Sequence, residues 1–263
     1  MTGIVSDIGA PFDLLPNLAA WQIAALVAAF LVGGIVKGTI GFGLPLVTIA
    51  LMANVVPPKE AIGISVLPTL ASNLLLVLEA RRPAATIRRH LAILLLLPVG
   101  VAAGALSIRA IDGQALMLGL GIVIMVFVAL DTVRIRLTVT AAHERLSGAI
   151  AGFVAGLFGG LTGVFAPPMV LHLLGLNLDR MAYVSAVGIL WTAAAASITV
   201  AFGAVDLLTV PLAIVAVALI VPMAAGMGIG RLIRLRLNPV WFRRAIAAGL
   251  FAAALRLVVT GLA

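Results

Sequence analysis

The chain has 263 residues, of which 63% are hydrophobic and 10% are charged, and its formal net charge is +8. A soluble domain cannot bury that fraction of apolar residues, so the composition excludes an ordinary soluble protein. Apolar runs of about 20 residues recur, each long enough to span the hydrocarbon layer of a bilayer as a helix. The composition therefore predicts an all-α polytopic membrane protein embedded in a lipid bilayer.

The excess of basic residues would suggest a nucleic-acid partner in a soluble protein. Here the Arg residues lie in short polar gaps between apolar runs, where they set orientation, so we expect no nucleic-acid partner. The chain has no Cys, which excludes thiolate metal sites, thiol nucleophiles and disulfides. Residues 1–18 contain no Lys or Arg and so lack the basic region of a signal peptide. They are expected to form a short surface segment.

Ten apolar elements follow in chain order: 19–37, 43–56, 61–80, 91–109, 113–131, 147–160, 164–175, 181–202, 207–230 and 240–262. Two continuous apolar stretches are each interrupted by Gly and Pro. We call residues 38–45 (GTIGFGLP) the first elbow and residues 159–168 (GGLTGVFAPP) the second elbow. Segments 43–56 and 164–175 are short for full spans, which favours half-helices that end inside the membrane.

The distribution of basic residues supports ten elements rather than eight. With an even number of passes in each interrupted stretch, three Arg clusters share the cytoplasmic side. The clusters are Arg81, Arg82, Arg88 and Arg89; Arg134, Arg136 and Arg145; and Arg231, Arg234, Arg236, Arg243 and Arg244. This arrangement predicts that both termini face outside.

The ten elements divide into two similar halves of five. Gly34, Gly38, Gly41 and Pro45 align with Gly156, Gly160, Gly163 and Pro167, and LPVGVAAG (97–104) aligns with VPMAAGMG (221–228). An odd number of elements per repeat inverts the second copy, a pattern typical of secondary transporters. We therefore predict repeats over 19–133 and 147–263, joined by a cytoplasmic linker over 134–146.

The elbows have the residues of an anion site. Pro45 and Pro167 are suited to the first turn of a helix, and the residues just before them would expose free N–H groups at its positive end. The expected substrate-binding groups in and beside the elbows are Lys37, Thr39, Gly41, Phe42, Gly43, Pro45, Thr162, Gly163 and Pro167. An alternative is that Lys37 extends to the cytoplasmic interface and only anchors the topology.

Polar residues on later elements are further candidates. Ser65 and Asn73, with their neighbours Thr69 and Ser72, surround Pro68, and Trp191 and Thr192 hold a similar place in the second half. Cavity lining and hydrogen bonding between helices are both open for them. His172 lies in an apolar half-helix, where packing and a proton-relay role are both open.

Other functions fit the residues less well. TIGFG (39–43) resembles a potassium filter, but Lys37 would repel the ion and the second elbow is no filter. Neither HExxH nor GxSxG occurs, so the chain is not expected to be an enzyme, and an anion channel or intramembrane enzyme is the alternative. GMGIG (226–230) follows no strand, and close helix packing explains it. No metal or cofactor is expected.

At these residues the chain resembles the sulfite exporter TauE/SafE family of bacterial membrane transporters. The resemblance rests on the paired elbows, on PPKEAIGISVLPTLASNLL (57–75) and on the late Pro-Gly segment of each half, and it extends from about Trp21 to Leu262. The first elbow departs from the family pattern, because it reads GFGLP where a GFGGG-like sequence is usual.

The resemblance implies export of a small anion, such as sulfite, sulfoacetate or another sulfur-containing or organic anion, across the bacterial cytoplasmic membrane. The expected partner is therefore a small anionic substrate. The sequence leaves open the coupling ion, a proton or sodium, and whether the chain forms a homodimer.

Overall fold

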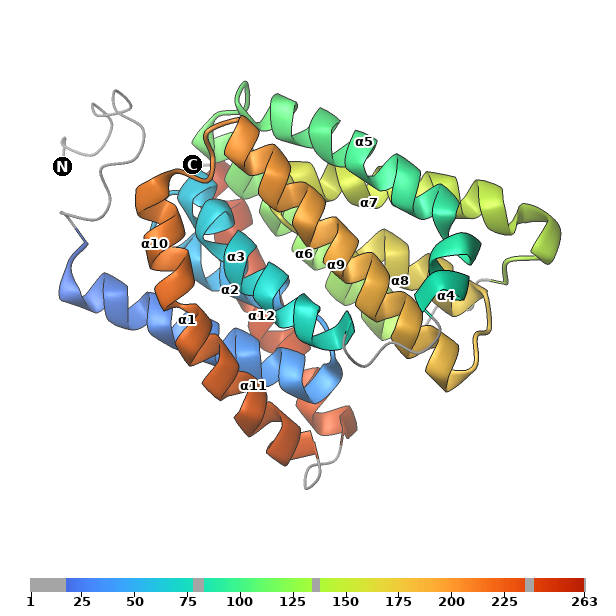
Figure 1. Ribbon diagram of the computed structural model, residues 1–263. Helices are drawn as coiled ribbons and strands as arrows, with labels where there is room; N and C mark the ends of the chain where they lie inside the picture. Colours follow the sequence, from blue (N-terminus) through green and yellow to red (C-terminus); the bar gives the residue numbers. More distant parts are fainter. Residues whose placement is uncertain (1–17, 78–82, 134–137, 235–238, 263) are drawn as a thin grey trace.

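The computed structural model describes residues 18–77, 83–133, 138–234 and 239–262, and these residues form helices without any strand. The predicted surface segment 1–18 lies outside the described residues apart from Leu18. The predicted all-helical class is therefore confirmed. Figure 1 shows one bundle in which helices of the two halves lie beside each other.

Six helices belong to the first half and six to the second. The first half contains α1 (Ala20–Ile40), α2 (Leu44–Met52), α3 (Pro58–Val77), α4 (Pro83–Arg89), α5 (Leu91–Ile108) and α6 (Gly113–Val133). A short 3-10 turn, η1 (Ala141–His143), precedes the second half. That half contains α7 (Glu144–Thr162), α8 (Ala166–Gly175), α9 (Arg180–Ala204), α10 (Val210–Ala218), α11 (Ile220–Arg234) and α12 (Pro239–Leu262).

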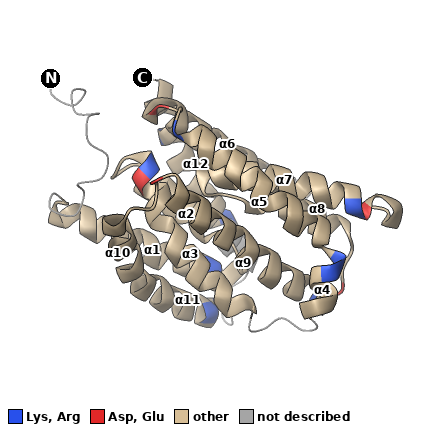
Figure 2. Cartoon of the chain, turned by 45° about the horizontal axis from the view of Figure 1, so that its top comes forward, with Lys and Arg blue, Asp and Glu red and all other residues tan. Residues whose placement is uncertain are grey.

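Seven helical segments of the described chain are long and apolar enough to cross a membrane, and Gly113–Ala129 and Ala166–Gly175 are shorter apolar helices. Large apolar side chains cover the outside of the bundle, such as Val200 at 73% and Val210 at 76% exposure. Figure 2 shows the charged residues mostly near helix ends, with most of the helix length uncoloured. The chain is a multi-pass membrane protein.

The two elbows are tight turns that each lead into a short helix. The first joins α1 to α2 through Gly41 and Gly43, at φ 98° and 92°, and the second joins α7 to α8 through Gly163, at φ 73°. Residues with a Cβ rarely adopt this left-handed region, which accounts for glycine there. The nine residues of α2 and ten of α8 span only about 14 and 15 Å, roughly half of the hydrocarbon thickness.

The helices pair across the two halves. The pair α1–α11 corresponds to α7–α5 when the halves are exchanged, and α3–α9 and α6–α12 correspond to themselves. Glycine allows the backbones of the first two pairs to touch. A Cβ at Gly34 would lie 2.3 Å from Met223 O, and one at Gly156 would lie 2.2 Å from Leu97 O. Small residues permit the same close approach in other membrane bundles.

Several helix bounds differ from those predicted. The segment 207–230 is two helices, α10 and α11, which separate at Leu219. Pro222 accounts for this break, because its ring lacks an N–H and clashes with the carbonyl four residues earlier. The Arg-rich gap after α3 also contains a helix, α4, which begins at Pro83. We expected no helix there because the gap is short and polar.

Candidate functional site

Lys37 lies near the C-terminal end of α1 and is buried, at 3% exposure. Its Nζ donates to Ser72 Oγ at 2.6 Å and to Asn73 Oδ1, both on α3. An ammonium group has three N–H donors, so these two acceptors leave one donor for a ligand. The buried, hydrogen-bonded position argues against a role as a mere interface anchor.

Asn73 connects three helices around the ammonium group. Its Oδ1 accepts from Lys37 on α1, and its Nδ2 donates to the Trp191 carbonyl on α9 at 3.1 Å. Thr192 Oγ1 donates to the Asn73 carbonyl at 3.0 Å. These bonds fix the amide so that its oxygen faces Lys37. Of the alternatives left open for these residues, hydrogen bonding between helices is therefore observed for Asn73 and Thr192.

A cavity lies where the two elbows meet. Its wall consists of elbow residues from both halves and side chains of α1, α3, α6 and α9: Lys37, Phe42, Gly43, Leu44, Pro45, Leu46, Thr69, Asn73, Phe127, Val164, Phe165, Ala166 and Trp191. Among these residues Lys37 is the one ionisable group, and no carboxylate of the described residues lines this cavity. The cavity therefore combines one positive charge with mostly apolar and aromatic walls.

Thr69 adds an unused polar atom to this wall. The residue is 4% exposed, and its Oγ1 is buried without a hydrogen-bond partner within the described residues. Thr69 also lines a second small cavity, together with Ser65, Gly163 and Phe165. A buried hydroxyl without a partner is costly, so a ligand or water that bonds Thr69 would be stabilised.

The two half-helices differ at the ends that face the cavity. In α2 the first hydrogen bond of the helix is donated by Val47 N–H to the carbonyl of the N-cap residue Gly43, at 3.0 Å. The N–H groups of Leu44 and Leu46 come before this bond, so the helix has no carbonyl for them to donate to. In α8 the first turn contains Pro167 and Pro168, neither of which has an N–H. The N-terminal end of α8 therefore has fewer N–H donors than that of α2.

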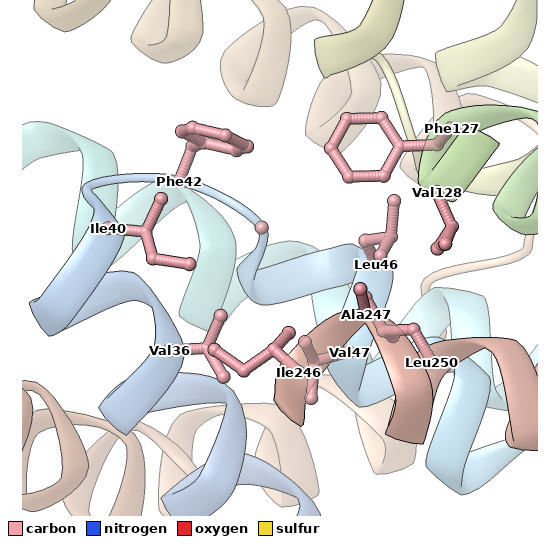
Figure 3. A pocket seen from close by; sticks show the side chains of 11 residues that line it. Val36, Ile40, Phe42, Leu46, Val47, Phe127, Val128, Ile246, Ala247 and Leu250 are labelled. Carbon is pink, nitrogen blue, oxygen red and sulfur yellow. The ribbon is translucent and has the colours of Figure 1, made fainter. Parts of the chain in front are cut away.

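An apolar groove adjoins the cavity and shares Phe42, Gly43, Leu46 and Phe127 with it. Figure 3 shows the Phe42 and Phe127 rings on either side of this groove, with Val36 and Ile246 deeper inside. The two rings meet edge to face with centroids 6.2 Å apart. Phe42 and Phe127 therefore line both the cavity that contains Lys37 and the apolar groove beside it.

Residues 25–257 match the family described as "Sulfite exporter TauE/SafE". The chain belongs to the TauE/SafE family. Members of this family are membrane transporters that export sulfite and other anions. The comparisons with curated proteins and with solved structures gave no match. Within the described residues of this TauE/SafE chain, no group of three His, Asp or Glu side chains is placed to hold a metal ion.

The structure brings six of the predicted site residues to the cavity of this TauE/SafE protein: Lys37, Phe42, Gly43, Pro45, Asn73 and Trp191. Ser65 and Gly163 line the neighbouring small cavity instead. Thr192 contributes through its bond to Asn73 rather than from the wall.

Four predicted residues serve the elbows and their packing. Thr39 Oγ1 donates to Ile35 O and Gly230 O, which ties α1 to α11. Thr162 Oγ1 donates to Phe158 O and accepts from Val164 N, which closes the second elbow. Gly41 has nothing within 4 Å of its Cβ position, and its φ of 98° accounts for the glycine there. Pro167 opens α8 without lining the cavity.

Sequence reasoning missed two of the aromatic residues in the wall, Phe127 and Phe165. Phe127 comes from the middle of α6, far in sequence from either elbow, and Phe165 packs edge to face on Trp191 with centroids 6.0 Å apart. No motif marks Phe127, because an apolar residue on an apolar helix gives no signal. Phe165 lies inside the second elbow, where its position beside Pro167 was the available indication.

Proposed function

We propose that this protein is a secondary transporter that exports a small sulfur-containing or organic anion, such as sulfite or sulfoacetate, across the bacterial cytoplasmic membrane by alternating access. One observation carries the proposal: the Lys37 ammonium is buried between the two elbows and is held by two neutral acceptors. Its remaining N–H donor and the cavity beside it suit one anionic group.

The energetics of the ammonium favour an anionic ligand. A buried charge without an opposite partner is costly, and polar residues inside membrane proteins commonly mark a substrate path. Ser72 and Asn73 satisfy hydrogen bonds but not the charge. A bound anion would supply the missing charge, while the free N–H groups at the start of α2 add donors. Sulfonate, sulfite and carboxylate groups all offer several acceptor oxygens.

Alternating access is supported by the arrangement of the helices. Exchanging the halves exchanges the pair α1–α11 with α7–α5, as expected for inverted repeats around a central site. The elbows, which are the non-helical backbone, meet at the cavity. We further propose that both termini face outside and that the Arg-rich loops face the cytoplasm, in accordance with the positive-inside rule.

Transport in proteoliposomes tests this proposal. Purified protein is reconstituted, and counterflow of labelled sulfite, sulfoacetate or acetate is measured with and without the same anion on the opposite side. A carrier should exchange faster when anion is present on both sides. A flux without such stimulation would favour the channel alternative, and the absence of any anion flux would contradict the proposal.

The chain provides a matched control for the charge, because Lys37 and Lys59 are its two lysines. Lys37→Gln should weaken anion binding by roughly 1.5–3 kcal/mol, the range for a hydrogen bond to a charged group. This corresponds to roughly 10- to 150-fold in the dissociation constant. Lys37→Arg should keep partial activity, and Lys59→Gln should bind as the wild type does. An unchanged dissociation constant in Lys37→Gln would remove Lys37 from the site.

A further inference from the structure

His172 is a buried titratable group that anion binding at Lys37 does not use. It lies on α8 and is 5% exposed. Its ring packs against α7, since a Cβ at Gly148 would lie 3.5 Å from His172 Nε2. Ala166, at the start of the same helix, lines the cavity, and six residues of helix place His172 about 9 Å further along the axis.

The hydrogen bonds of Ser147 place the proton of the neutral ring. Ser147 Oγ donates to the Glu144 carbonyl at 3.2 Å, and the same oxygen lies 3.2 Å from His172 Nδ1. With the Ser147 proton directed at the Glu144 carbonyl, His172 Nδ1 donates to Ser147 Oγ and Nε2 carries the free lone pair. His172 Nε2 is buried and has no hydrogen-bond partner within the described residues. In this tautomer Nε2 can accept a proton.

The charged groups around this ring belong to a small cluster at the end of the bundle. Glu144 on α7 favours a positive ring and Arg89 on α4 opposes it, while these two side chains bond each other at 2.6 Å. His90 is also buried nearby, but burial and then Arg89 lower its pKa to about 4, so it stays neutral. Arg180 and Tyr183 lie on α9, which also packs on α8, and neither forms a hydrogen bond with the imidazole within the described part of the chain.

The first half has no counterpart of this histidine. The alignment that sets Pro45 opposite Pro167 sets Ala50 opposite His172, and Ala50 is fully buried. The same alignment sets Lys37 opposite Gly159. The first half therefore contributes the buried amine of Lys37 at the cavity, and the second half contributes the buried imidazole of His172 further along α8.

We propose that His172 Nε2 binds the proton that moves together with the exported anion. The inference rests on the proposed transport function and names its coupling ion. Protonation converts Nε2 from an unpaired acceptor into a donor. It also adds a positive charge to α8, the helix whose first residue lines the cavity. An anion in the cavity stabilises that charge, and the charge in turn strengthens anion binding, because such coupling is reciprocal.

The experiment measures two fluxes in the same proteoliposomes. Anion counterflow reports binding and exchange of sulfoacetate, and a trapped pH dye reports proton movement when a sulfoacetate gradient is imposed without a pH gradient. The wild type should show both. His172→Gln, whose amide can still bond Ser147 but cannot bind a proton, should retain counterflow and lose the proton movement. His143→Gln is the matched control, because His143 is exposed and bonds only Thr140.

The outcomes separate this inference from the function on which it rests. Proton movement that persists in His172→Gln would overturn the assignment to His172 and leave anion transport intact. The absence of counterflow in the wild type for sulfite, sulfoacetate and acetate alike would overturn the transport function and this inference with it.

A second variant tests the assignment if His172→Gln fails to reach the membrane. Ser147→Ala removes the hydrogen-bond partner of Nδ1 and should shift the pH at which proton movement is half-maximal. An unchanged midpoint in Ser147→Ala would contradict the proposal.

Discussion

The first elbow and the second elbow share a backbone design and differ in chemistry. Both turn at glycines with positive φ and lead into a half-helix that carries proline in its first turn. At corresponding positions, however, Lys37 stands opposite Gly159 and Gly43 opposite Phe165. A lysine at Gly159 would meet α9, since a Cβ there would lie 3.0 Å from Ile198.

This comparison teaches that repetition of the scaffold does not require repetition of the site. The first elbow supplies the positive charge and the free N–H groups. The second supplies an aromatic wall through Phe165 and, further along α8, the free acceptor of His172. A cavity built from two unlike halves can bind one anion in one orientation. The following variants are chosen to remove or to sharpen that difference.

The largest effect is expected from a carboxylate placed beside Lys37. Asn73→Asp would pair the ammonium internally and repel an incoming anion, so sulfoacetate binding should weaken by at least roughly 1.5–3 kcal/mol. Isothermal titration of the purified protein measures the change. Thr192→Val, which loses the bond to the Asn73 carbonyl and no charge, is the control and should bind within a few fold of the wild type. Equal losses in both variants would mean that packing rather than charge governs the site.

The next effect tests whether the helix pairs of the two halves are equivalent. A Cβ at Gly34 or Gly156 would meet a carbonyl oxygen of the partner helix, so each Ala variant should lose about 1–3 kcal/mol through overpacking. Thermal unfolding in detergent should show similar falls for both. Gly228→Ala is the control, because nothing lies within 4 Å of its Cβ position. A large fall in the unfolding temperature of only one of the two variants would show that the helix pairs are not equivalent.

A smaller difference should separate the two turns. Gly41→Ala places an ordinary residue at a φ of 98°, which costs roughly 1–2 kcal/mol by backbone strain alone. Gly163→Ala is also strained, at a φ of 73°, and its Cβ would in addition lie 2.8 Å from Ile49 Cδ1. The Gly163 variant should therefore unfold at the lower temperature. A lower unfolding temperature for Gly41→Ala would show that the first elbow depends more strongly on glycine than the open space around Gly41 indicates.

The smallest effects are expected from the elbow threonines. Thr39→Val loses bonds to Ile35 and Gly230, and Thr162→Val loses bonds to Phe158 and Val164. Each should lower stability by about 0.5–1.5 kcal/mol, the usual net value of a hydrogen bond, without changing anion affinity. Measuring affinity and unfolding on the same samples separates the two effects. A weaker dissociation constant for Thr39→Val would return Thr39 to the binding site.

The sequence by itself determined the class of the protein, the position of both elbows and six of the thirteen residues that line the cavity. These features are local: an apolar run of sufficient length predicts a membrane helix, and glycine and proline at fixed spacing predict a turn followed by a helix. Lys37 was recognisable because a lysine beside an intramembrane turn is rare and costly. The break between α10 and α11 was also local, since Pro222 marks it, although the apolar composition concealed it.

Only the tertiary structure decided which side chains meet. Phe127 reaches the cavity from α6 because of how the helices pack, and nothing in its own sequence neighbourhood distinguishes it from other apolar residues. Thr39 and Thr69 show that the residue type and its helix do not reveal what the side chain contacts. Both are threonines on helices near the elbows. Thr39 donates a hydrogen bond to α11, whereas the buried hydroxyl of Thr69 has no partner within the described residues. A helix position fixes a direction relative to its own axis, whereas the packing of helices distant in sequence determines what lies in that direction.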